Sequence, residues 1–170
     1  MKFLVLTDIH GSIKYLKMAM EKFSMHKCEK ILLLGDLLYH GPRNDLPLEY
    51  NPKEVISLLN SYKDKIISVK GNCDAEVDEM VFEFPLFPEA VIKLNSTTVT
   101  LTHGHHVDEL EFEGYVLFGH THVNKHEGKL VNIGSVSIPK DTHHTYAILE
   151  DAGLVSYDLL NDLEIMRVEF

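Results

Sequence analysis

The chain has 170 residues, of which 45% are hydrophobic and 25% are charged, and its net charge at pH 7 is −10. A chain of this length buries roughly 70% of its unfolded surface, which predicts one compact domain over residues 1–170 and excludes disordered and collagen-like chains. The acidic balance disfavours long nucleic acid and anionic membrane surfaces as partners.

Three continuous apolar runs in the first half predict strands that are buried on both faces. They lie at residues 3–6, 31–34 and 66–69. One helix is expected to begin at Ser12 and a second at Asn51, with Pro52 in its first turn. The first helix has an apolar stripe formed by Ile13, Leu16, Met20 and Phe23. Alternating strands and helices predict a parallel sheet with right-handed crossovers.

The acidic stretch at residues 74–79 has the spacing of a short helix with a solvated face. Its early carboxylates would lie near the positive end of that helix, which favours this interpretation over a cation site.

From Ala90 onward the apolar segments are shorter and alternate in or near period two, which predicts mostly antiparallel strands. These segments lie at residues 91–94, 97–101, 130–133, 146–149 and 166–170. Turn signals at Asn95-Ser96, Asp151-Ala152-Gly153 and Asn161-Asp162 separate several of them. Two sheets in one domain of this size are expected to pack face to face, with the early helices on one outer face.

Polar side chains follow each of the buried strands. The fragments are Asp8-Ile9-His10, Gly35-Asp36, Gly71-Asn72-Cys73-Asp74, His103-Gly104-His105 and Gly119-His120-Thr121-His122. Ligands collect at the carboxyl ends of strands in open α/β sheets, so these fragments are expected to meet in one pocket. Carboxylates, amides and imidazoles bind hard to borderline divalent ions. In an extended segment, His120 and His122 would project to the same side of the chain, where they could act as neighbouring ligands.

Each fragment taken alone also has a structural interpretation. Asp8 could cap the first helix, and Asp36 could be a turn residue. Asn72 could adopt a left-handed backbone, and His103 could be a core histidine with its hydrogen bonds satisfied. Their shared position directly after apolar strands favours a metal site, because the structural interpretations do not predict that coincidence.

The ordered set of these fragments resembles the calcineurin-like metallophosphoesterases. Residues 40–44, 71–74 and 134–140 look like the small bacterial YfcE-type phosphodiesterases within that superfamily. The resemblance implies an α/β fold, a four-layer arrangement in which a two-sheet mixed β-sandwich is flanked by helices. It also implies a metal-dependent phosphodiesterase for small phosphodiesters, in which a hydroxide bridging two divalent metals attacks phosphorus in line.

The same resemblance implies seven metal ligands. One ion would be held by Asp8, His10 and His122, the second by Asn72, His103 and His120, and Asp36 would bridge them. A carboxylate between two cations offsets their repulsion, and the neutral ligands leave positive charge for an anionic substrate. Manganese is the expected metal, and iron, zinc, nickel and magnesium also accept such ligands. The catalytic residues are expected to be Asp36, His103 and Cys73.

Cys73 departs from the superfamily pattern, in which a histidine at this position helps to protonate the leaving oxygen. Two nearby cations are expected to lower the pKa of the thiol and leave a thiolate that cannot donate a proton. The sequence therefore predicts a preference for diesters with good leaving groups, unless His105 or His106 supplies the proton. The alternative is a small buried cysteine without a catalytic part.

Substrate-binding residues are expected in the long loop that follows the second strand. Arg43 and Asn44 lie directly after Pro42, and a guanidinium fork suits phosphate, although both residues could instead pin the loop. His105 and Lys140 are further candidates for contacts with the substrate.

The main alternative function is a non-catalytic protein-interaction scaffold on the same fold, and a phosphomonoesterase or nuclease is the alternative within catalysis. The presence of all seven ligands favours catalysis. The resemblance also implies a homo-oligomer, either a dimer or a tetramer.

No apolar run approaches the roughly 20 residues that a bilayer span needs, so no membrane partner is expected and the cytoplasm is the expected location. Cys28 and Cys73 are expected to be reduced, because two such cysteines make no disulfide framework.

Overall fold

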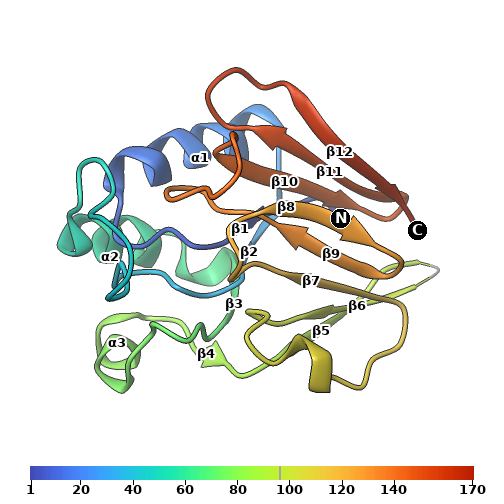
Figure 1. Cartoon of the computed structure of the whole chain (residues 1–170), viewed down its shortest axis with the longest axis horizontal. Helices are drawn as coiled ribbons and strands as arrows, with labels where there is room; N and C mark the ends of the chain where they lie inside the picture. The colour runs from blue at the N-terminus through green and yellow to red at the C-terminus, as the bar shows by residue number, and fades with distance from the viewer. Residues whose placement is uncertain (96) are drawn as a thin grey trace.

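The computed structural model describes residues 1–95 and 97–170, and within those residues the chain forms three α-helices and twelve strands (Figure 1). The helices are α1 (Ile13–Met25), α2 (Pro52–Asn60) and α3 (Glu76–Val81), with short 3₁₀ helices at Lys63–Lys65 and Val107–Glu109. The strands are β1 (Phe3–Leu6), β2 (Lys30–Leu33), β3 (Ile66–Val69), β4 (Leu86–Phe87), β5 (Ala90–Lys93), β6 (Thr98–Leu101), β7 (Tyr115–Phe118), β8 (Asn124–Glu127), β9 (Leu130–Ile133), β10 (Thr145–Glu150), β11 (Gly153–Asp158) and β12 (Glu164–Glu169). The predicted turn at Asn95-Ser96 includes Ser96, which lies outside the described residues.

The first sheet has seven strands in the order β12-β11-β10-β1-β2-β3-β4. Strands β1 to β4 run parallel, which confirms the parallel arrangement predicted for the first half. Strands β10, β11 and β12 complete the sheet in antiparallel pairings. Because β1, β2 and β3 are parallel neighbours, the loops that follow them leave the sheet at the same edge.

The second sheet has five strands in the order β5-β6-β7-β9-β8. Its two outer pairings are antiparallel, as the second half of the sequence predicts, but β6, β7 and β9 run parallel to one another. A parallel pair needs a long crossover, and residues 102–114 supply it between β6 and β7. The parallel β6 and β7 bring His103 and the Gly119–His122 segment to one edge.

Two apolar clusters explain why the strands of the first half are continuous apolar runs. One cluster lies between the helices and the seven-stranded sheet, and it includes the whole predicted stripe of α1. The other lies between the two sheets, with Val5, Leu32 and Val99 among its fully buried members. A strand between two such clusters must be apolar on both faces. The predicted face-to-face packing and the helix-covered outer face are therefore confirmed.

Both predicted helix starts are confirmed, and the first one lies beside the ligand fragments. The Ser12 hydroxyl caps α1 by accepting a hydrogen bond from Tyr15 N (3.4 Å), and it donates to Leu48 O (2.7 Å). The Asn51 side chain caps α2 by accepting from Glu54 N (3.3 Å). Within the described residues, none of the helices is long and apolar enough to cross a membrane.

Candidate metal centre

Five loops bring the predicted ligands to one place. Asp8 and His10 follow β1, Asp36 follows β2, Asn72 follows β3, His103 follows β6, and His120 and His122 follow β7. A cavity of about 300 Å³ forms where these loops meet. Of the seven predicted ligands, five line the cavity, while Asp8 and His103 are fully buried beneath it.

Five of these residues have a left-handed backbone, which residues other than glycine rarely adopt. Asp8, His10, Asp36, His120 and His122 have φ angles between 47° and 65°. Such strain persists only where surrounding bonds over-determine it, and it gathers at functional sites. The bonds from Asp8 N to Gly35 O (3.1 Å) and from His10 N to Asp36 O (2.9 Å) hold the first two loops together in this way.

The prediction of an extended segment at His120 and His122 is wrong. The two left-handed residues turn the chain, so the imidazoles point to different neighbours instead of lying side by side. The His122 ring lies 5.0 Å from the His10 ring, and the His120 ring lies 5.1 Å from the His103 ring. Each ring thus belongs to a different half of the cluster.

The first half of the cluster consists of Asp8, His10 and His122. Asp8 Oδ1 lies 3.1 Å from His122 Nε2 and 3.4 Å from His10 Nε2, and the two nitrogens are 3.2 Å apart. Asp8 Oδ2 accepts hydrogen bonds from the Thr7 hydroxyl (2.6 Å) and from His120 N (3.0 Å), whereas Asp8 Oδ1 is buried without a hydrogen-bond partner. A buried carboxylate oxygen without a partner is costly, and a cation among these three atoms would satisfy it.

Three histidines are oriented in the same way, with the Nδ1–H group donating to a backbone carbonyl. The bonds run from His10 to Tyr39 O (2.6 Å), from His103 to Leu34 O (2.8 Å) and from His122 to Ile138 O (2.5 Å). In each case the Nε2 atom is left facing the cluster. This outer support fixes the tautomer and the ring orientation that a metal-binding imidazole needs.

The second half of the cluster surrounds Asp36. Asp36 Oδ2 lies 3.3 Å from His103 Nε2 and 3.7 Å from His10 Nε2, so it stands between the two halves. Asn72 Oδ1 is 3.0 Å from His103 Nε2. The His120 ring lines the cavity beside them, although its nitrogens do not join the tightest groups of candidate ligand atoms in the described chain.

The charges of the cluster are strongly coupled. Burial opposes ionisation of Asp8 and Asp36, but the nearby His10 and His122 imidazoles lower the pKa of the Asp8 carboxyl, and the His103 imidazole lowers the pKa of the Asp36 carboxyl. Burial lowers the pKa of His103, yet its bond to Asp36 and the charges of Asp8 and Asp36 raise that pKa to about 9. Both carboxylates are therefore ionised, and His103 carries a proton that a cation would have to displace.

Four of the remaining predicted site residues line the same cavity, namely Cys73, Arg43, Asn44 and Lys140. The Asn44 side chain donates to His40 O (2.8 Å), so it pins the loop. Arg43 and Lys140 are exposed and form no ion pair with any described residue. His105 is exposed and is absent from the described lining, with its ring 6.1 Å from the His120 ring.

The Cys73 Sγ atom lies close enough to ligand atoms of His10 and Asp36 for the three residues to hold one metal ion. Burial, followed by the charge of Asp36, raises the pKa of its thiol to about 12. The protein groups alone therefore keep Cys73 as a thiol, and the thiolate predicted from the sequence depends entirely on the two cations.

The interpretation of residues 74–79 as a solvated helix face is wrong for Asp74. Residues 76–81 do form α3, but Asp74 precedes that helix and is buried with 6% of its surface exposed. Its carboxylate accepts hydrogen bonds from Asp36 N, Leu37 N and Gly71 N. The surrounding acidic run conceals this role, while its place directly after Asn72-Cys73 is the one signal for it.

Sequence reasoning also missed Asn132, a buried amide in the middle of β9. Its Nδ2 donates to Gly119 O (2.7 Å) and to the Thr121 hydroxyl (2.8 Å), and its Oδ1 accepts from Gly134 N (2.9 Å). These bonds hold the turn that carries His120 and His122. A lone polar residue in an otherwise apolar strand is the signal that could have identified it.

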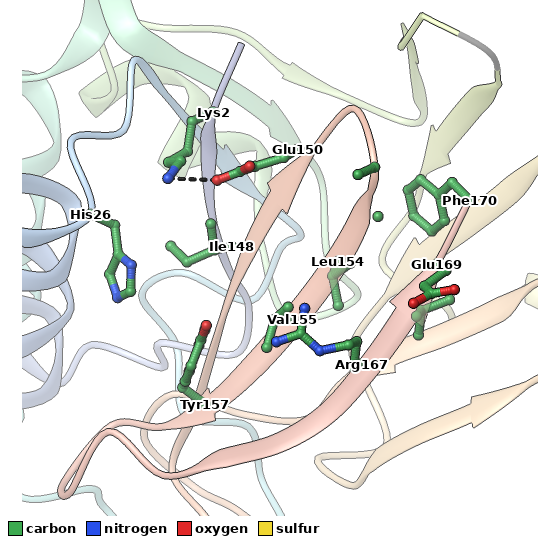
Figure 2. Close-up of a pocket in the computed structure, with 13 residues that line it drawn as sticks. Lys2, His26, Ile148, Glu150, Leu154, Val155, Tyr157, Arg167, Glu169 and Phe170 are labelled. Carbon is green, nitrogen blue, oxygen red and sulfur yellow. Dashed lines mark ion pairs between the residues drawn. The ribbon is translucent and has the colours of Figure 1, made fainter.

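A larger hollow of about 530 Å³ lies elsewhere, beside the end of α1 and over β10, β11 and β12 (Figure 2). Figure 2 shows His26, Tyr157 and Arg167 around it, with an ion pair between Lys2 and Glu150. The candidate metal-ligand groups of the described chain all belong to the smaller cavity. The smaller cavity is therefore the candidate site of the chemistry.

Comparisons with known proteins show the family and the fold of the chain. The sequence profile of the calcineurin-like phosphoesterase superfamily domain matches residues 1–152. Phosphodiesterase YfcE of Escherichia coli strain K12 is 38% identical over 98% of this chain and 96% of its own length. The structure of Yfce, a phosphoesterase from E. coli, matches with a TM-score of 0.93 and 36% identity over 99% of both chains. A Vps29 mutant from Entamoeba histolytica matches with a TM-score of 0.66 and 20% identity over 100% of this chain and 99% of its own, a likeness of fold alone.

Proposed function

Because the chain belongs to the calcineurin-like phosphoesterase superfamily, we propose that it is a phosphodiesterase that uses two divalent metal ions to hydrolyse small phosphodiesters. The observation that carries this proposal is the arrangement around Asp8 Oδ1. A buried carboxylate oxygen without a hydrogen bond faces two imidazole Nε2 atoms, whose rings are held from behind by backbone carbonyls. A divalent ion would take up this oxygen together with the two imidazole nitrogens.

The seven side chains divide between the two ions in a way that the distances support. Asp8, His10 and His122 would hold one ion, Asn72, His103 and His120 the other, and Asp36 Oδ2 would be shared. Two ions held here would activate a water for in-line attack at phosphorus and offset charge on the phosphoryl oxygens. Manganese is the proposed metal, and iron, zinc, nickel and magnesium suit the same ligands.

The protein's own part in the reaction is to bind the phosphodiester and to orient it. The Arg43 guanidinium lines the cavity without an ion pair to the described residues, so it is free to form a forked pair of hydrogen bonds with the phosphate. Asn44 holds that loop through its bond to His40 O. Lys140 enters from the loop between β9 and β10, where its backbone N–H donates to His122 O (2.9 Å), and adds a second positive charge.

Proton delivery to the leaving oxygen distinguishes this chain within its superfamily. Cys73 occupies the place of the usual histidine and contacts the Asn72 side chain (3.4 Å). If its proton is lost to the cations, leaving-group assistance falls to His105 or His106 or is absent, and aryl esters should react best. His105 lies on the same side of the site as His103, with their rings 5.6 Å apart.

The substrate is proposed to be small and soluble. The cavity is about 300 Å³, and the chain carries a net charge of −10, which opposes long nucleic acid but allows a cyclic or dinucleotide diester.

The test uses metal-free protein on a panel of aryl phosphodiesters and phosphomonoesters, with each divalent ion added back separately. We expect diester hydrolysis that depends on the added ion and exceeds monoester hydrolysis. Asp36→Ala should abolish activity most completely, because it weakens both proposed ion sites together. Preferential monoester hydrolysis would favour a phosphomonoesterase, and no hydrolysis with any ion would favour a non-catalytic scaffold.

A further inference from the structure

The Asp74 carboxylate lies where the loop after β2 meets the loop after β3. Its Oδ1 accepts a hydrogen bond from Leu37 N (2.8 Å), and its Oδ2 accepts from Asp36 N (2.8 Å) and Gly71 N (2.7 Å). Hydrogen bonds to an ionised carboxylate are about twice as strong as neutral ones. A side chain that accepts three of them while buried is therefore firmly placed.

Two of these three bonds fix the backbone of Asp36 itself. The peptide groups that donate from Asp36 and Leu37 are the ones on either side of the Asp36 Cα atom. Holding both groups sets the φ and ψ angles of Asp36, whose φ of 56° is the unfavourable left-handed value. The Asp74 carboxylate thus offsets the strain that this backbone conformation costs.

The third bond, from Gly71 N, lies within the loop that carries Asn72, so the same carboxylate joins that loop to Asp36. Asp36 forms a second link between the two loops, because its Oδ1 accepts a hydrogen bond from Cys73 N (2.8 Å). Each carboxylate is thereby bonded to the backbone of the other segment. The approach is so close that a Cβ atom at Gly71 would lie 2.1 Å from Asp36 Oδ1. With Oδ1 occupied, the remaining Asp36 Oδ2 is turned toward His103 and His10.

We propose that Asp74 is a positioning residue of the metal centre, which aligns the bridging Asp36 and the Asn72 loop before any ion binds. This inference rests on the proposed function only in taking the cluster to be a metal site. Asp74 is absent from the described residues that line the cavity, so it acts through Asp36 and not through contact with an ion or substrate.

The test compares Asp74→Asn with Asp78→Asn. Asp78 belongs to the same segment and its loss removes the same charge, but its Oδ2 accepts from Ala75 N (2.8 Å) at the start of α3, away from the ligand loops. Asparagine at position 74 would point its amide group at one of the three N–H donors. Mn²⁺ binding to the metal-free full chain is measured by calorimetry, below the melting temperature of each variant.

We expect Asp74→Asn to weaken Mn²⁺ binding about 10-fold to 100-fold, as loss of an outer-shell partner does, and Asp78→Asn to change it less than about twofold. Asp74→Glu, which keeps the charge but displaces the carboxylate, should also weaken binding. Wild-type affinity for both ions in Asp74→Asn, even with a lower melting temperature, would overturn the proposal, because a merely structural residue changes stability and not the affinity of the folded protein.

Hydrogen exchange on the metal-free wild type keeps the inference testable if the Asp74 variants do not fold. The amides of Asp36, Leu37 and Gly71 should be protected before any ion is added, and unprotected exchange at these amides would overturn the proposal. The proposed function fails differently. A wild type that binds two ions but hydrolyses no diester contradicts the phosphodiesterase and leaves the binding comparison intact.

Discussion

Ion binding to this cluster should release a proton, because His103 holds one in the metal-free protein. Its pKa of about 9 reflects the buried carboxylates of Asp36 and Asp8, which favour the imidazolium. With a pKa raised above 7, His103 is mostly protonated at pH 7. A divalent ion that takes Nε2 must displace this proton, which weakens its binding at pH 7.

The direction of the pH dependence follows from the raised pKa. Lowering the pH favours the protonated, metal-free form, so the apparent Kd for Mn²⁺ should fall about tenfold for each unit of rising pH, up to a pH of about 9. His10, whose pKa is raised by its bond to Asp8 despite the opposing effect of burial, adds to the release.

Calorimetry of Mn²⁺ binding in buffers with different ionisation enthalpies counts the protons that are released. We expect the release of at least about one proton per protein between about pH 6.5 and 8.5. His126→Gln is the matched control, because His126 is exposed and bonded to Gly128 O away from the cluster. A Kd that does not change with pH, or the absence of proton release, would refute the assignment of His103 as a ligand.

Three substitutions test the parts of the site separately. Cys73→His should raise activity on poor alkyl leaving groups relative to aryl ones, and no relative gain in a leaving-group series would count against the role of position 73. Arg43→Gln should raise KM by about 10-fold to 100-fold with little change in kcat, as expected for about 1.5 to 3 kcal/mol of hydrogen bonding to a charged group, whereas the exposed Lys129→Gln should change neither constant. Asn132→Ala should lower the free energy of unfolding by about 3 kcal/mol and weaken Mn²⁺ binding, because buried partners in the turn of His120 and His122 lose their bonds. Urea unfolding of the metal-free protein checks the stability change, and an unchanged midpoint would contradict it.

Much of the fold follows from local pattern. Runs such as residues 3–6 and 31–34 are apolar on both faces because they lie between two apolar clusters, so period and composition are sufficient to predict them. The caps Ser12 and Asn51 act through neighbours three residues away, which a sequence displays directly. The position of ligand fragments directly after these strands then predicts that they meet.

The parts that could not be predicted depend on contacts between distant segments. Nothing local distinguishes Asp74 from the exposed acids after it, because its burial comes from backbone groups of Asp36 and Leu37 on another loop. The left-handed turn at His120 and His122 is likewise stabilised from outside, by Asn132 in a later strand and by Asp8, whose carboxylate accepts from His120 N. The parallel pairing of β6, β7 and β9 depends on a crossover whose path the sequence does not display.

The proposed metal centre can be observed directly in an anomalous-scattering map from crystals grown with Mn²⁺. We expect two peaks about 3.5 to 4 Å apart in the smaller cavity, one beside Asp8 and the other beside His103, with Asp36 between them. A map with no peak in that cavity, or with its peaks beside other side chains, would contradict the metal centre and the hydrolase proposed from it.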